Sequence, residues 1–229
     1  MSILKPIIPI VFAFMFVSSA NSQDITLRLA TQPEGNKLTA LGEPYIHCAL
    51  KHLKQPYTLD RIPWQRAQNS TQLGLHDGFF MASKTVERDS YASLSQEILS
   101  IKWLYVTLRK KAISPNQSSF YNLKFSAELG SARYQWLRKI HNDGIITQEI
   151  ETPSDPASVI KMLLVNRIDI ALMNSITLKE LIKSLAINKQ DLSSYIAYEK
   201  PTGVYFGHAF IKQNPLFLTR FNQALLRCK

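Results

Sequence analysis

Histidine, cysteine and acidic side chains are the groups in this 229-residue sequence that could do chemistry, and few of them are spaced for it. His47 and His52 are five residues apart, and on a helix this spacing turns the two rings away from each other, which disfavours a shared metal ion. His76 and Asp77 could supply half of an acid–base pair, but adjacent residues usually point apart. The sequence has no glycine-rich phosphate loop and no G-x-S-x-G or H-E-x-x-H motif. We therefore expect a protein that is not an enzyme and that uses no metal or cofactor.

The N-terminal residues 1–22 have the pattern of a secretory signal peptide. A lysine precedes an apolar stretch at 7–17, and small residues dominate 18–22. We predict cleavage after Ser22, with Ala20 as the alternative site, and export to the periplasm. A retained membrane anchor is the other interpretation, but it needs a span of about 20 apolar residues.

Export changes the interpretation of Cys48 and Cys228, because an oxidising compartment permits a disulfide. Cys48 lies in a segment with helical apolar spacing, 45–53, and Cys228 ends a similar stripe at 217–228. If the last helix packs on the first, a disulfide would close most of the chain and contribute up to about 5 kcal/mol. The alternative is two separate thiols, one of them pairing with another chain.

Composition and charge restrict the class of protein. The sequence is 45% hydrophobic and 19% charged, which is typical of a globular domain and excludes a disordered, collagen-like or polytopic chain. Its net charge is +10, and loss of the signal peptide leaves 26 basic and 17 acidic residues, or +9. The basic residues are scattered, with short clusters at 109–111 and at Arg133, Arg138 and Lys139. We expect both clusters to form solvated surfaces, with an anion site as the alternative interpretation. On an exported protein this charge suits a weakly anionic ligand or membrane surface, and we expect no nucleic-acid partner.

Strand-like and helix-like segments alternate along the chain, which predicts an α/β protein with parallel strands. The predicted strands are 25–29, 57–62, 77–82, 101–108, 168–173 and 203–211. The predicted helices are 45–53, 64–73, 131–140, 156–164, 176–185 and a terminal helix after Pro215. A polar turn is expected at 83–88.

Several of these segments carry a recognisable pattern. In the first half it comprises residues 63–67, 76–80 and 85–92, and in the second half Gly130-Ser131 at a helix start and 166–172 before a loop. In this order and spacing, with a signal peptide, the sequence resembles the family 3 extracellular solute-binding proteins. That family includes the periplasmic amino-acid-binding components of ABC transporters.

The resemblance implies a two-lobed type II periplasmic binding protein fold. Two strands would cross between the α/β lobes, near Leu108 and Gly203, and the ligand would lie in the cleft between the lobes. The expected organisation is lobe I at 23–107, lobe II at 108–202 and a return to lobe I at 203–229.

The resemblance also suggests site residues. Arg88 falls where the family places the arginine that grips a ligand carboxylate, and a guanidinium fork suits that task. Ser83 falls where a hydroxyl or backbone group holds the same carboxylate, and Trp64 falls at an aromatic wall. Gly130 and Ser131 would offer N–H groups at a helix start.

Ordinary structural roles are open for two of these residues. Arg88 could be a surface arginine that pairs with Glu87 or Asp89, and Trp64 could belong to the core of a lobe.

Two positions depart from the amino-acid-binding pattern. Asn174 stands where such proteins usually have an aspartate that neutralises the ligand's α-ammonium, and an amide lacks that charge. Gln32 stands where an aspartate or an aromatic residue is expected. We therefore expect a small anionic or zwitterionic carboxylate-bearing solute rather than an ordinary α-amino acid.

These observations predict a solute-binding function. We expect a periplasmic monomer that captures its solute by lobe closure, for transport through a membrane permease or for sensing through a receptor. The alternatives are a ligand-sensing or accessory protein with a degenerate cleft and, less favoured, an exported enzyme on the same fold.

Overall fold

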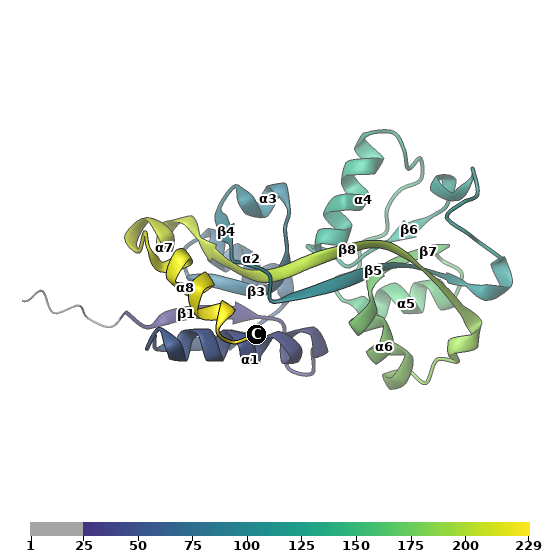
Figure 1. Cartoon of the computed structure of the whole chain (residues 1–229). Helices are drawn as coiled ribbons and strands as arrows, with labels where there is room; N and C mark the ends of the chain where they lie inside the picture. Colours follow the sequence, from purple (N-terminus) through teal and green to yellow (C-terminus); the bar gives the residue numbers. More distant parts are fainter. Residues whose placement is uncertain (1–24) are drawn as a thin grey trace, which may run out of the picture.

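The computed structural model describes residues 25–229, and the predicted signal peptide, 1–22, lies outside the described residues. Figure 1 shows two α/β bodies joined by two long strands, β5 (Leu99–Leu108) and β8 (Leu192–Gly207). We call the body that contains both ends of the described chain lobe I and the other lobe II. The chain leaves lobe I along β5 and returns to it along β8, so these two strands position the lobes.

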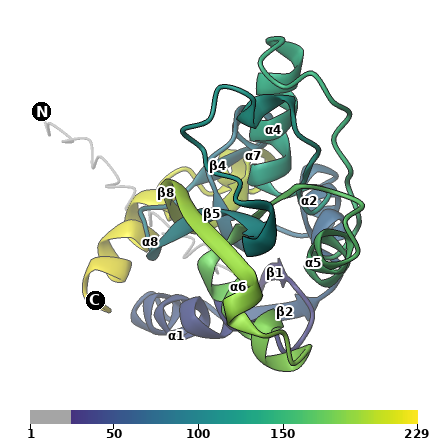
Figure 2. The ribbon, with the colours of Figure 1, turned by 90° about the vertical axis from the view of Figure 1, so that its right-hand side faces the viewer.

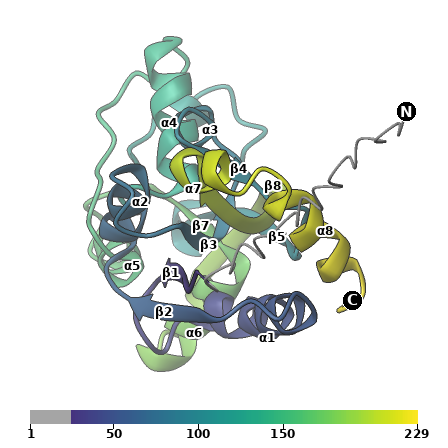
Figure 3. The same cartoon turned by 90° about the vertical axis from the view of Figure 1, so that its left-hand side faces the viewer.

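Lobe I is a sheet covered by helices on both faces. Strand β1 pairs in parallel with β2 and β3. Neighbouring residues of β1 face opposite sides, so Leu29 packs with α1 and Ala30 packs with α2. Helices α1 and α2 therefore lie on opposite faces (Figure 3). The elements are β1 (Leu27–Thr31), α1 (Lys37–His52), β2 (Tyr57–Arg61), α2 (Trp64–Gln72), β3 (Gly78–Ser83), α3 (Val86–Asp89), β4 (Ala92–Leu94), α7 (His208–Gln213) and α8 (Phe217–Leu226).

Lobe II repeats this arrangement around β7. Figure 2 shows α4 at the top of the view, above α5 and α6. Leu137 of α4 packs with Ile170 on one face, and Ile160 of α5 packs with Ala171 on the other. The elements are the 3₁₀ turns Arg109–Lys111, Phe120–Asn122 and Lys189–Asp191, together with β6 (Phe125–Ser126), α4 (Ala132–Asn142), α5 (Pro156–Leu164), β7 (Ile170–Asn174) and α6 (Ser175–Ser184). No helix in the described part of the chain is long and apolar enough to cross a membrane.

The prediction of parallel strands is right for β1 with β2 and β3 and for β6 with β7, and wrong for the pairs that the crossing strands form. One sheet runs through both lobes in the order β2-β1-β3-β8-β5-β7-β6, with β4 also paired to β8. Strand β8 pairs antiparallel with β3, β4 and β5, and β5 pairs antiparallel with β7. The mixed sheet follows from the two crossing strands, which run in opposite directions.

Two predicted elements have wrong boundaries. The strand predicted at 203–211 begins at Leu192 and ends at Gly207, and α7 follows. In the first half of β8, alternate side chains are exposed to solvent. This half of the strand pairs with β5 between the lobes and does not lie in the core of either lobe. Helix α1 begins at Lys37 instead of 45 and carries Pro44 inside it, where a proline normally marks a helix start. The predicted turn at 83–88 contains the short helix α3.

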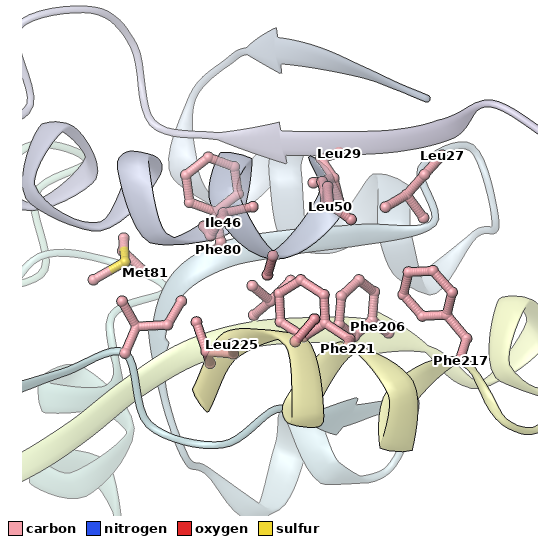
Figure 4. Close-up of a cluster of buried hydrophobic side chains, with 14 of the residues drawn as sticks. Leu27, Leu29, Ile46, Leu50, Phe80, Met81, Phe206, Phe217, Phe221 and Leu225 are labelled. Atoms are coloured by element: carbon pink, nitrogen blue, oxygen red, sulfur yellow. The ribbon is translucent and has the colours of Figure 1, made fainter. Parts of the chain in front are cut away.

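The C-terminal helix returns to lobe I and packs on α1. Phe221 and Leu225 of α8 face Ile46 and Leu50 of α1 in one apolar cluster (Figure 4). The predicted disulfide between Cys48 and Cys228 is present at this contact, with a Cα–Cα distance of 6.0 Å and a sequence separation of 180. The disulfide thus links the two chain segments that form lobe I.

The disulfide should stabilise the folded protein strongly. Replacing both cysteines by serine should lower the free energy of unfolding by up to about 5 kcal/mol, because the unfolded chain regains the entropy of a very long loop. Urea denaturation of both proteins, with and without reductant, measures this difference. Reductant should destabilise the wild type and leave the double-serine variant unchanged; an equal response of both proteins would contradict the assignment.

Candidate ligand-binding site between the lobes

A small cavity of about 30 Å³ lies between the lobes, and most of the predicted site residues line it. A volume of this size holds roughly two water molecules. The predicted residues that line it are Gln32, Trp64, Ser83, Arg88, Ser131 and Asn174. Gly130 precedes this lining and contacts Arg88 through its carbonyl oxygen. Sequence reasoning therefore selected residues that the fold brings together.

Strand topology explains this convergence. Gln32 follows the end of β1, Ser83 ends β3 and Asn174 ends β7. The carboxyl ends of strands in open α/β sheets form a crevice in which ligands bind. Both lobes turn these strand ends toward the cavity, so residues from three strands reach one site.

Arg88 is the most constrained polar residue of the site. It is only 1% exposed. Its Nε donates to Gln68 Oε1 at 2.9 Å, its Nη1 to the Ser83 carbonyl at 2.7 Å and its Nη2 to the Gly130 carbonyl at 3.0 Å. The guanidinium also lies 5.4 Å from the centre of the Trp64 ring. This burial excludes the alternative of a surface arginine.

The charge of Arg88 has no acidic partner. Among residues 25–229, no carboxylate lies within ion-pairing distance of it. Burial lowers the pKa of the Arg88 guanidinium from its ordinary value to about 10, so the group stays protonated at neutral pH. A buried cation that is held by neutral acceptors can still attract an anion.

A second buried arginine lines the cavity from lobe II. Arg133 Nη2 lies 3.2 Å from Glu128 Oε2, and the two side chains are 12% and 9% exposed. The Arg133 Nε atom is buried and has no hydrogen-bond acceptor among the described residues. Burial raises the pKa of the Glu128 carboxyl, and it lowers the pKa of Arg133. Two arginines and one glutamate give the cavity a formal charge of +1.

The sequence favours a solvated surface over an anion site for Arg133, Arg138 and Lys139, and it does not single out Glu128. The structure shows that Arg133 is largely buried, while Arg138 and Lys139 are exposed. One signal was available: Arg133 lies in the first turn of α4, where the helix dipole disfavours a cation. A cation there needs a separate stabilising partner, and Glu128 provides it.

Gly130 connects the two lobes through its carbonyl oxygen. Its carbonyl accepts hydrogen bonds from Arg88 and, at 3.1 Å, from Gln68 Nε2. Its φ is +71°, and a Cβ at this position would overlap Gln65 Oε1. The neighbouring Ser131 N–H donates to the Glu128 carbonyl. In this conformation the lobes therefore touch directly at the site.

Asn174 is occupied as a helix cap. Its Oδ1 accepts from the Thr177 N–H at 2.7 Å, and its Nδ2 donates to Thr177 Oγ1 at 2.8 Å. The amide thus serves the start of α6, although it also lines the cavity. Glu128 is the carboxylate in the lining of this cavity, and a ligand ammonium would have to share it with Arg133.

Trp64 has both roles that the sequence left open. It packs edge-on against Phe79 at 5.6 Å within the core of lobe I, and it lines the cavity. Ser83 is buried and supplies its carbonyl to Arg88, and Gln32 is half-buried at the cavity wall.

The other candidate chemical groups lie elsewhere. His76 Nε2 lies 2.9 Å from Asp60 Oδ2, while Asp77 pairs with Arg28 at 2.7 Å. Within the described chain, the group whose side chains come close enough for a shared metal ion is Cys48, His52 and Cys228. Its two cysteines form the disulfide, which leaves no thiolate to bind a metal.

Comparisons with known proteins match the architecture and not the sequence. No protein-family model matches the chain, and no curated protein matches it. A solved histidine kinase sensor domain with similarity to periplasmic binding proteins superposes with a TM-score of 0.74 at 10% identity, covering 89% of this chain and 90% of that one. The substrate-binding protein of an ABC uptake transporter from Streptococcus pneumoniae, with bound histidine, gives 0.69 at 12% identity, covering 88% and 86%.

A third similar structure is an ancestral amino-acid-binding protein described as a precursor of cyclohexadienyl dehydratase. Its TM-score is 0.63 at 16% identity, with 88% of each chain covered. At such low identity the similarity establishes the fold alone. The chain has the two-lobed α/β fold of periplasmic binding proteins, as the resemblance predicted.

The contact at Gly130 should control the distance between the lobes. Gly130→Leu should separate them, because the added side chain must displace Gln65 and break the hydrogen bonds from Arg88 and Gln68. Small-angle X-ray scattering should then show a larger radius of gyration. Gly144→Leu is the matched control, since Gly144 has a similar φ of +74° with open space around it. Backbone strain should lower the free energy of unfolding of both variants by about 1–2 kcal/mol. An unchanged radius of gyration for Gly130→Leu would refute the role of this contact.

Proposed function

We propose that this protein is a periplasmic solute-binding protein that captures a small carboxylate-bearing solute between its lobes, for transport or for sensing. The observation that carries the proposal is the buried Arg88 guanidinium, which lines the interlobe cavity without an acidic partner. A guanidinium can bind both oxygens of a carboxylate in parallel.

The charge of the cavity supports an anionic ligand. Arg88 and Arg133 outnumber the single carboxylate of Glu128, and the unused Nε of Arg133 is a further buried donor. A bound monoanion would neutralise this excess. A buried polar group without a partner costs about 1–3 kcal/mol, and a ligand oxygen would remove that cost.

The same cavity is poorly suited to an α-amino acid. Neutralising an α-ammonium needs a free carboxylate, but Glu128 is paired and Asn174 caps α6. Some proteins of similar fold do carry a bound amino acid, as the histidine-bound structure illustrates. We infer that the solute here has a carboxylate and needs no ammonium group.

Ligand entry requires the lobes to open. In the closed conformation the Gly130 carbonyl occupies one of the donors of Arg88 that a carboxylate would use. A rotation of the lobes about β5 and β8 would free that donor. The register of the pairing between β5 and β8 shifts between Trp103 and Leu104, and this irregularity lies where the strands cross between the lobes. Ligand contacts with both lobes would then favour closure again.

A sensory or accessory role is the second candidate. The lobes touch directly around a cavity of only about 30 Å³, and one structure of the same fold is a kinase sensor domain. In that role the closed, ligand-free protein would dock on a receptor; in transport the closed, loaded protein would dock on a permease. An enzyme on this fold is the less favoured alternative.

Loss of Arg88 should abolish tight carboxylate binding. Arg88→Ala should weaken the affinity by at least about 2 kcal/mol, or roughly 30-fold, because a buried carboxylate loses its charged partner. Isothermal titration calorimetry over monocarboxylates, dicarboxylates and amino acids measures this. Arg88→Lys keeps the charge and loses the fork, so it should bind with intermediate affinity. Arg220→Ala, which removes an exposed cation from α8, is the control. Unchanged affinity in Arg88→Ala would remove this residue from the site.

Binding should strengthen as the pH falls below neutral. Burial raises the pKa of Glu128, so on acidification Glu128 takes up a proton and the formal charge of the cavity rises from +1 to +2. Trifluoroacetate stays ionised over this range and is a suitable probe. Its affinity should rise in the wild type as the pH falls toward the ordinary pKa of a glutamate, about 4.3, and the rise should begin at a higher pH than for an exposed glutamate. Glu128→Gln should bind more tightly at pH 7 and show little pH dependence; the same pH profile in both proteins would contradict the role of Glu128.

A further inference from the structure

A second, much larger hollow lies between the lobes, beside the small cavity. This outer groove has a volume of about 810 Å³. Lys84 and Val86 of lobe I form one side, and Trp136 and Arg138 of α4 form the other. Its lining residues come largely from α4 and from the segment 84–87 at the start of α3. Figure 1 shows α3 and α4 on the same side of the two crossing strands. Its volume is in the range of pockets that bind small organic molecules.

The outer groove and the small cavity adjoin each other. Trp103 and Ala132 line both. Two segments of the chain also line both hollows. In lobe I, Ser83 lines the small cavity and Lys84 lines the outer groove. In α4 of lobe II, Arg133 lines the small cavity and Trp136 lines the outer groove. A ligand group in the small cavity could therefore extend into the groove.

The wall of the groove is aromatic and its rim is cationic. Trp136 and Trp103 both pack edge-on against Tyr198, at 5.0 and 6.1 Å between ring centres. The Lys200 ammonium lies over the Trp103 and Tyr198 rings at 5.9 and 5.2 Å. The lining includes four cations and two acidic residues, namely Lys84, Arg138, Lys139 and Lys200 with Glu87 and Asp143. An aromatic body attached to an anionic group fits this combination.

We infer that the ligand is an aromatic carboxylate that binds with its carboxylate in the small cavity and its aromatic body in the outer groove. This inference rests on the proposed function, because it uses Arg88 as the carboxylate partner. The small cavity has room for little more than the carboxylate, and the groove supplies the remaining volume. Such a ligand contacts both lobes and the crossing strands at once, so it stabilises the closed form.

A ligand series tests this binding mode. We would titrate acetate, phenylacetate and indole-3-acetate and obtain apparent affinities from thermal-shift curves. Affinity should rise at least about tenfold from acetate to indole-3-acetate, since each ring adds buried apolar surface. Trp136→Ala should remove most of that gain and leave acetate binding unchanged, and Trp136→Phe should keep most of it. Tyr121→Ala, which removes another half-buried aromatic of lobe II, is the control for stability.

The outcomes separate this inference from the proposed function. If all three carboxylates bind with equal affinity, or if Trp136→Ala weakens them equally, the groove does not hold the ligand body and the inference fails while carboxylate binding stands. If the aromatic acids bind as well to Arg88→Ala as to the wild type, they bind in the groove without the small cavity, which overturns the proposed orientation. If no carboxylate shifts the melting temperature, the proposed function itself fails.

Discussion

The burial of the Arg88 charge is the constraint on which the rest of the site depends. A cation removed from water loses several kcal/mol of hydration unless other groups replace it. Here neutral acceptors do so, from α2, from the end of β3 and from Gly130 before α4. These groups belong to both lobes, so the guanidinium that organises the strand ends of lobe I also determines how lobe II approaches. Because the acceptors are neutral, they replace hydration and leave the positive charge available to an anion.

The crossing strands set the geometry around that charge. Strands β5 and β8 pair over their length and carry the sheet from one lobe into the other. Trp103 of β5 pairs with Tyr198 of β8 and also with Asn174 at the end of β7. The aromatic cluster, the strand end and the shift in register therefore coincide at the junction of the lobes. Movement at this junction changes the small cavity and the outer groove together, because Trp103 borders both.

Much of the fold was predictable because short motifs and apolar periodicity are local properties. Apolar periodicity predicted the elements within each lobe. The resemblance to a known family implied the two-lobed fold and the placing of Arg88 and Ser83 at one site. The remainder depends on contacts between distant segments. The sequence of the first half of β8 shows only a weak alternation of apolar and polar residues, because the partner of this segment is another crossing strand. The start of α1 was placed too late because Pro44 lies inside the helix. The burial of Arg133 beside Glu128 was not predicted, because it depends on contacts with segments that are distant in the sequence.

Lobe I consists of two chain segments separated by the whole of lobe II, and this arrangement imposes an order of folding. The sequence of lobe II is continuous, so its contacts are relatively local and can form early. Lobe I combines α1 with α8 across a separation of 180 residues at the disulfide, and contacts of such high contact order form slowly. Until α8 arrives, the apolar face of α1 stays exposed and open to association with other chains. Because the interlobe site needs both lobes, it is complete only once α8 has packed on α1, and the disulfide then holds that contact in place.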